Sequence, residues 1–247
     1  MKRKNLLITS IGKLDSLPTW ISEDRNFDIA LIYYANEIDE GVKKQLETYS
    51  DFLFFESGFK YSIIKTVLTK NPELLNYEYF WMPDDDVKLV KGGANKLFDL
   101  AKKYQLGLAQ PSTKKKNTSW KLLRHKAGVT LRYCNFVEVM CPLFSSKSLT
   151  ACLETFSYSK SGWGLDFLWP TLIDEKSAII DDIVIFHSKK INLDGGVLYN
   201  KLLEEVGKTP WQELEEISTK YNLSAEPKVF LEIYDNSFIG KLKKLFA

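Results

Sequence analysis

The sequence has no long apolar segment. No stretch approaches the roughly 20 apolar residues that a helix needs to cross a bilayer, so we expect a protein that is not integral to a membrane. The apolar run near the start, Leu6-Leu7-Ile8, is too short for the core of a signal peptide and is better interpreted as a first strand. By default, these absences predict a cytoplasmic location.

The sequence also has few cysteines and a small net charge. The three cysteines, Cys134, Cys141 and Cys152, are odd in number, lack metal-site spacing and stand in apolar surroundings. We therefore expect reduced thiols in the core, which fits a reducing compartment. The 34 Lys and Arg residues nearly balance the 32 Asp and Glu residues, and a formal charge of +2 does not predict a nucleic-acid partner.

The sequence is rich in hydrophobic residues that can form a core. Hydrophobic residues make up 45% and aromatic residues 13% of the 247 residues, which indicates an ordered globular chain and favours one continuous domain. In the first half we expect strands at 6–9, 29–34, 52–55 and 77–82, and helices at 39–48, 59–69 and 91–104. This alternation predicts an α/β fold with a mainly parallel sheet flanked by helices.

The second half follows a different pattern. We expect an exposed loop from Pro111 to Trp120, paired strands at 128–133 and 136–140, a helix at 146–156 and a strand at 179–186. After residue 190 the pattern is mostly helical, which predicts a helical extension at the C-terminal end.

Three consecutive carboxylates follow the aromatic strand expected at 77–82. Pro83 ends that strand because it has no N–H to donate, and Asp84, Asp85 and Asp86 then emerge at its carboxyl end. In extended backbone, the side chains of Asp84 and Asp86 point to one side and that of Asp85 to the other. Two neighbouring carboxylates suit Mg²⁺ or Mn²⁺. The alternative is a solvated acidic turn.

A glycine-flanked tryptophan stands farther along, in Gly162-Trp163-Gly164-Leu165-Asp166. The glycines permit backbone conformations through which a ligand can approach closely, while Trp163 stacks on a sugar face. Asp166 would open a helix whose dipole favours the ionised carboxylate, the form that accepts a proton from a hydroxyl. The alternative is an aspartate that only caps the helix.

Two other ionisable residues stand in apolar runs. His187 ends the strand expected at 179–186 and is one of only two histidines, so it is either a metal ligand or a hydrogen-bonded surface residue. Glu138 lies among apolar neighbours, and a buried acid there contacts a sugar or forms a structural ion pair.

Four segments together resemble a little-characterised family of GT-A-like glycosyltransferases that is catalogued as a domain of unknown function, DUF707. They are Trp81 to Asp86, Phe136 to Ser145, Gly162 to Asp166 and Asp181 to His187. The third segment is also similar to the Trp-Gly-Gly-Glu-Asp stretch of inverting β-galactosyltransferases. The resemblance implies a Rossmann-like, GT-A-like nucleotide-sugar-binding and catalytic domain over 1–190, with 191–247 as a helical extension packed on it.

The resemblance also implies a role for each motif. Asp84 and Asp86 match the Asp-X-Asp ligands of a divalent cation, Mn²⁺ or Mg²⁺, that binds the nucleotide diphosphate, and His187 matches a third ligand. Asp166 takes the place of the catalytic base. The implied contacts to the donor or acceptor sugar are Glu138, Trp163 and Gly164. Leu165 stands where inverting enzymes often carry a second acid, so the stereochemical outcome stays open.

Residues at other strand ends complete the expected donor site. Thr9 and Ser10 form a small polar turn suited to uracil or ribose contacts, and Asp85 is left for the ribose or a structural contact. Lys60, at a helix start, could reach a phosphate, although a solvated lysine is the ordinary alternative. The expected partners are a UDP-sugar donor and a saccharide or lipid-linked glycan acceptor.

The segment 236–247 predicts a short basic amphipathic helix. One face carries Phe238, Ile239, Leu242, Leu245 and Phe246, and lysines stand opposite. Such a helix can lie in an anionic membrane interface, which would make the protein peripheral at the inner face of the membrane. Packing on the body of the protein is the alternative.

The leading hypothesis is a metal-dependent glycosyltransferase that uses a nucleotide-diphosphate sugar, with Asp166 as the base of an inverting reaction. One alternative is a non-catalytic protein of the same fold that binds a nucleotide or glycan. Another is a metal-dependent phosphoesterase, because acidic clusters also assemble two-metal sites.

Overall fold

A computed structural model describes residues 3–35, 37–114, 118, 120–187, 196–224 and 226–245. The strands are β1 (Asn5–Ile11), β2 (Phe27–Tyr33), β3 (Phe52–Phe55), β4 (Tyr79–Trp81), β5 (Val87–Lys91), β6 (Leu106–Thr113), β7 (Val129–Cys134), β8 (Leu143–Ser145), β9 (Lys176–His187) and β10 (Val229–Tyr234). The α-helices are α1 (Glu40–Tyr49), α2 (Lys60–Lys70), α3 (Ala94–Lys103), α4 (Ser146–Cys152), α5 (Leu165–Leu172), α6 (Val197–Val206), α7 (Pro210–Tyr221) and α8 (Phe238–Leu245).

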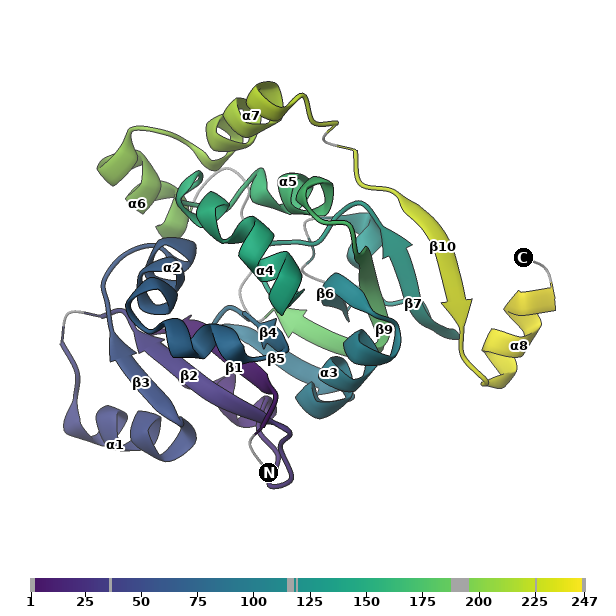
Figure 1. Cartoon of the computed structure of the whole chain (residues 1–247), viewed down its shortest axis with the longest axis horizontal. Coiled ribbons are helices and arrows are strands. Elements are labelled where there is room, and N and C mark those ends of the chain that lie inside the picture. The colour runs from purple at the N-terminus through teal and green to yellow at the C-terminus, as the bar shows by residue number, and fades with distance from the viewer. Residues whose placement is uncertain are drawn as a thin grey trace.

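The strands form one mixed sheet through the centre of the molecule (Figure 1). Its order is β10-β7-β9-β6-β8-β4-β1-β2-β3, with β5 paired to β9 off this path. Strands β4, β1, β2 and β3 run parallel, as do β6 and β9. Strands β5, β7, β8 and β10 pair antiparallel with their neighbours. The expected α/β class, a sheet flanked by helices, is confirmed.

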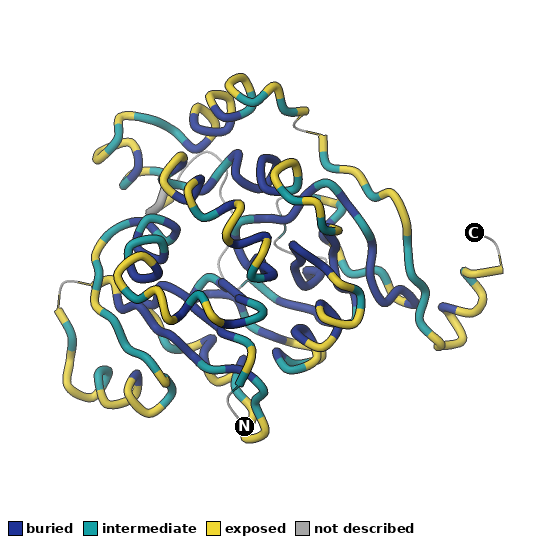
Figure 2. Tube along the Cα trace, viewed as in Figure 1, coloured by how far each residue is buried: buried dark blue, intermediate teal, exposed yellow. Residues whose placement is uncertain are grey.

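Both faces of the sheet are covered by apolar side chains, because neighbouring residues of a buried strand point to opposite faces. In β1, Leu7 joins a core on the face covered by α1 and α3, whereas Leu6 and Ile8 join a second core under α2, α4 and α5. Figure 2 shows the buried strands between the two helical layers. Because β1, β2, β3 and β4 run parallel, their carboxyl ends emerge together at one end of the sheet, where ligands bind in open α/β sheets.

The structure corrects two expected elements. The segment 136–140 forms no strand and is an irregular connection before β8. Residues 111–113 belong to the buried strand β6 and not to an exposed loop. Lys115, Lys116 and Asn117 lie outside the described residues.

The C-terminal part is helical with one exception. Helices α6, α7 and α8 agree with the expected pattern, but β10 adds a strand to the edge of the sheet beside β7. The prediction of a helical extension is thus incomplete. Cys134, Cys141 and Cys152 are buried and free, as expected. Among the described residues, no helix has the length and apolar character required to span a bilayer.

Candidate functional site

The acidic run lies in a turn between β4 and β5, at the carboxyl end of β4. The carbonyl of Asp84 accepts a hydrogen bond from the Val87 amide at 3.1 Å, which closes the turn over Asp85 and Asp86. The strand-like alternation expected for the three carboxylates is therefore wrong. The turn directs each carboxylate toward a different partner.

Asp86 lies beside His187, and the strand register explains why. Val87 begins β5 and pairs with His187 at the end of β9, so the residue before Val87 meets the imidazole. The Nε2 atom of His187 lies 3.2 Å from Oδ1 of Asp86, and both side chains are largely buried. The structure thus brings together two residues, about 100 positions apart in the sequence, that the sequence analysis proposed as metal ligands.

Asp84 forms an ion pair with Lys60 at the start of α2. The Nζ of Lys60 lies 2.6 Å from Oδ1 of Asp84 and also donates to the carbonyls of Val139 and Met140, at 3.0 and 3.1 Å. Burial and the neighbouring charge of Asp86 raise the pKa of Asp84, and the ammonium of Lys60 opposes them. Lys60 is therefore held at the acidic turn, with one positive charge beside the carboxylates.

Asp85 joins the turn to the ends of β1 and β2. Its Oδ2 accepts hydrogen bonds from the amides of Gly12 and Lys13, at 2.9 and 3.1 Å, and from the hydroxyl of Tyr34 at 3.0 Å. Burial, followed by the charge of Asp85, raises the pKa of Tyr34. These contacts agree with the structural role that the sequence left open for Asp85.

Thr9 and Ser10 lie at the carboxyl end of β1, below the acidic turn. The hydroxyl of Thr9 is fully buried and donates to the carbonyl of Pro83. Ser10 is also buried. Thr9 therefore supports the turn from beneath and offers no surface for direct contact with a ligand.

A hollow of about 300 Å³ opens beside Tyr34, at the ends of β2 and β3. Its lining residues are Tyr33, Ala35, Ile38, Phe55, Glu56 and Ser57. The rings of Tyr33 and Phe55 meet edge to face with centroids 6.3 Å apart. The hollow thus offers aromatic and polar groups next to the residue that hydrogen-bonds Asp85.

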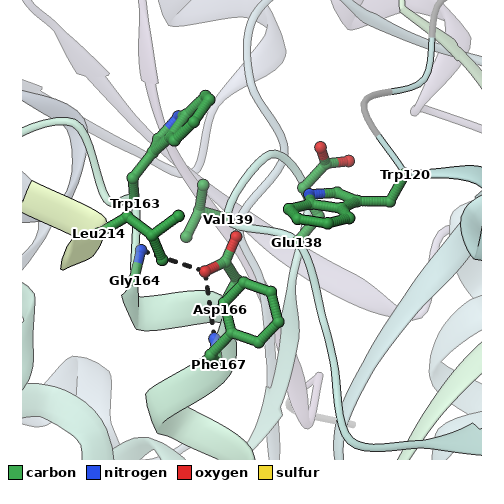
Figure 3. A pocket seen from close by; sticks show the side chains of 8 residues that line it. All are labelled: Trp120, Glu138, Val139, Trp163, Gly164, Asp166, Phe167 and Leu214. Carbon is green, nitrogen blue, oxygen red and sulfur yellow. Dashed lines mark hydrogen bonds between the residues drawn. The ribbon is translucent and has the colours of Figure 1, made fainter. Parts of the chain in front are cut away.

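A second pocket surrounds Asp166 (Figure 3). It is lined by Trp120, Glu138, Val139, Trp163, Gly164, Asp166, Phe167 and Leu214. Figure 3 shows the Asp166 carboxylate between Trp163 on one side and Trp120 and Glu138 on the other. The cavity measures about 30 Å³, which holds one or two waters and not a hexose.

The backbone around Asp166 follows the expected pattern. Gly162 and Gly164 have φ angles of +85° and +91°, in the region that favours glycine. Helix α5 begins after Gly164, and Oδ1 of Asp166 accepts from the amides of Gly164 and Phe167 at 3.2 and 3.1 Å.

The protonation of Asp166 differs from the expectation. Burial, and next the charge of Glu138, raise its pKa to about 8, although the two amide hydrogen bonds oppose this shift. The helix dipole does not keep this carboxyl ionised at neutral pH, because desolvation is the larger effect. A buried group with a pKa close to the working pH is suited to proton transfer.

The connection at 136–142 joins the two halves of the site. The amide of Asp84 donates to the carbonyl of Met140 at 2.8 Å, and Val139 lines the pocket of Asp166. The amide of Glu138 donates to the side-chain oxygen Oε1 of Gln110, on β6. One short irregular segment therefore spans from the acidic turn to the pocket.

Sequence reasoning missed the contribution of α7. Its Glu213 is buried and accepts hydrogen bonds from the hydroxyl of Ser159 at 2.9 Å and from the amides of Lys160 and Ser161, both at 2.8 Å. Leu214 lines the pocket. Helical spacing marks an apolar face on α7, but only the folded chain shows that this face covers Asp166. Trp120 was also missed as a pocket residue, because only the folded chain brings it beside Asp166.

The donor set of the acidic turn fits a divalent cation that is also bound by its substrate. Within the described residues, no three His, Cys, Asp or Glu side chains are grouped so as to hold a metal by themselves. Asp86 and His187 supply two adjacent ligand atoms, and Asp84 is engaged by Lys60. Mg²⁺ and related ions use one or two protein carboxylates and take further oxygens from substrate phosphates and water. The residues present fit that mode of binding.

Comparison with known proteins gives no family assignment. The sequence matches no protein-family model and no curated protein sequence. Membership of the domain-of-unknown-function family therefore stays a resemblance in motifs.

Three solved structures align with most of this chain at low sequence identity. The crystal structure of S. aureus TarS residues 1–349 in complex with UDP-GlcNAc matches 88% of this chain and 72% of its own, with 10% identity and a TM-score of 0.49. A second crystal structure of S. aureus TarS residues 1–349 matches 75% of this chain and 60% of its own, with 9% identity and a TM-score of 0.47. A crystal structure of a protein from STIV matches 74% and 85%, with 10% identity and a TM-score of 0.43. At these identities the function has to be inferred from the chain's own residues.

Proposed function

We propose that the protein is a glycosyltransferase that transfers a sugar from a nucleotide diphosphate to an acceptor hydroxyl. The observation that carries the proposal is the joining of two unlike sites by the segment 136–142. One is an acidic turn with the pair Asp86 and His187, 3.2 Å apart, and the other is an apolar pocket around Asp166. Transfer from a nucleotide sugar needs both a site for the diphosphate and a base at the acceptor.

The donor would occupy the carboxyl edge of β1 to β4. Asp86 and His187 would hold a Mn²⁺ or Mg²⁺ ion, which supplies positive charge to the diphosphate when bound. Lys60 adds a fixed positive charge at the same turn. The hollow at Tyr33 and Phe55 would take the nucleoside, because its aromatic rings and polar groups suit a base and ribose.

Asp166 would act as the base at the acceptor. The acceptor oxygen forms a bond to the anomeric carbon, the bond from that carbon to the diphosphate oxygen breaks, and the hydroxyl proton passes to the Asp166 carboxylate. Trp163, which is half-buried, would stack on the acceptor or donor sugar. Since the cavity holds only one or two waters, a sugar enters only if Trp120 or Trp163 turns aside.

The experiment is a transfer and hydrolysis assay on a panel of nucleotide sugars with Mn²⁺, followed by mass spectrometry. We expect turnover of at least one donor, and its loss in Asp86→Asn and Asp166→Asn. Asp174→Asn is the matched control, because the Asp174 side chain is 90% exposed and lies in a surface ion pair. Unchanged activity in both site variants would remove the assigned roles.

The same panel separates the alternatives. Nucleotide-diphosphate binding without turnover of any donor would favour a non-catalytic binding protein. Release of phosphate from a diester substrate would favour a metal-dependent phosphoesterase.

A further inference from the structure

Helix α8 uses one face to contact the rest of the protein. A Cβ on Gly128 would lie 2.7 Å from Cγ2 of Ile239, so the helix approaches the backbone closely at this point. The Nζ of Lys243 donates to the carbonyl of Ala127 at 2.7 Å. Ile239, Gly240 and Lys243 thus form the face of α8 that packs on the chain.

A different face of α8 is apolar and exposed. Phe238, Leu242 and Leu245 recur at i, i+4 and i+7, which aligns them in one stripe. Their exposed fractions are 81%, 46% and 79%. Figure 2 shows α8 at the margin of the molecule, beyond β10, with most of its surface exposed. Packing on the body of the protein therefore leaves the apolar stripe uncovered.

The charges next to this stripe are of one sign. Lys241 and Lys244 stand on α8 beside the stripe, and residues 236–247 contain three lysines and no acidic residue. Asp235, the nearest preceding acid, accepts hydrogen bonds from the hydroxyl and the amide of Ser237; the hydroxyl lowers its pKa most, and the charges of Lys91 and Lys243 lower it further. Asp235 therefore stays negatively charged, but the three lysines of residues 236–247 outnumber it and leave positive charge in excess along α8.

We infer that α8 docks on an anionic lipid bilayer. An eight-residue helix is too short to cross a membrane, but exposed apolar residues flanked by lysines suit the boundary between acyl chains and anionic headgroups. A second copy of the chain placed on the same face would bring lysines against lysines. An anionic bilayer buries the apolar stripe at its acyl boundary and places anionic headgroups beside the lysines. This inference does not depend on the proposed catalytic function.

The test uses the full chain and cosedimentation with vesicles. One set contains phosphatidylcholine alone, and the other contains equal amounts of phosphatidylcholine and phosphatidylglycerol. We expect binding to the anionic vesicles that weakens with added salt, and little binding to the neutral ones. In the double variant F238S and L245S, binding to the anionic vesicles should fall roughly tenfold or more, because two large apolar side chains are lost.

A matched control is Phe230→Ser on β10. Phe230 is 67% exposed but lies outside α8, so its replacement should leave vesicle binding unchanged. Equal binding of the wild type to both vesicle types, no binding at all, or an unaffected double variant would overturn the inference. So would light scattering that shows a dimer which the double variant dissociates, because a second copy would then occupy the face.

Discussion

The carboxylate of Glu213 accepts a hydrogen bond from the hydroxyl of Ser161 at 2.6 Å, and this contact ties α7 to the loop that carries Trp163. The indoles of Trp163 and Trp211 also meet edge to face with centroids 4.8 Å apart. The C-terminal part of the chain therefore builds one wall of the pocket around Asp166. We therefore propose Glu213 as a positioning residue, because its contacts reach that pocket only through the loop.

Replacement of Glu213 by glutamine should loosen this loop. The variant keeps the size of the side chain but loses the charge that strengthens its hydrogen bonds, so we expect a loss of about 1–2 kcal/mol in the free energy of unfolding. The KM for the acceptor should rise more than the KM for the donor. Urea denaturation and steady-state kinetics measure both. Glu215→Gln, at an exposed position of the same helix, should change neither, and equal changes in both KM values would refute the positioning role.

The raised pKa of Asp166 predicts the pH dependence of transfer. A base must be ionised, so kcat/KM should rise with pH through the pKa of about 8. Glu138→Gln removes a negative charge that raises this pKa, and the rising limb should therefore move to lower pH. Asp166→Asn should lower kcat by about 10²–10⁴-fold. A limb that stays in place in the Glu138 variant would show that the titrating group is not Asp166.

The same pKa predicts that the free energy of unfolding depends differently on pH in the wild type and in Asp166→Asn. The pKa rises from 3.8 to about 8 on folding, so the folded chain binds the Asp166 proton more tightly between these values. The free energy of unfolding should therefore fall as pH increases through this window, with a contribution of at most about 1.4 kcal/mol per pH unit. Asp166→Asn lacks this contribution and should gain stability relative to the wild type as pH rises. Parallel curves for the two proteins in denaturant titrations would contradict the assignment.

Lys60 should matter for the stability of the acidic turn. Lys60→Met removes the ion pair with Asp84 and two hydrogen bonds to carbonyls, so we expect a loss of about 1–3 kcal/mol in the free energy of unfolding. Lys70→Met is the matched control on the same helix. The Lys70 side chain is 63% exposed and pairs with Glu56, so its loss should cost less than about 1 kcal/mol. Equal losses in urea titrations of the two variants would count against the role of Lys60.

The parallel strands were predictable because they are continuous apolar runs. The strand at 52–55 has the bounds that the sequence predicted, and α2 is displaced by one residue at each end from the predicted 59–69. β5 was missed, because the segment Val87–Lys91 is short and its ladder depends on β9, far away in the sequence. At 136–140 an apolar run indicated burial correctly, but the backbone is held by Lys60 and Gln110 and not by a neighbouring strand.

The sequence identified the residues of the candidate site, but it did not predict how they are arranged in space. The acidic run, His187 and Asp166 stand out by residue type. Their partners come from the fold, since the pairing of Val87 with His187 places the imidazole at Asp86. The protonation of Asp166 depends on how completely its surroundings exclude water, and no local sequence pattern reports that.

The most direct test of the central claim is calorimetric titration with UDP, in the presence and absence of Mn²⁺. Our account predicts that Mn²⁺ strengthens UDP binding to the wild type and that His187→Ala reduces this metal-dependent gain by about 10–100-fold. His125→Ala, which replaces the other histidine, near Asp181, should retain the gain. UDP binding that is absent, or equally strong without the metal, would contradict the proposed diphosphate site.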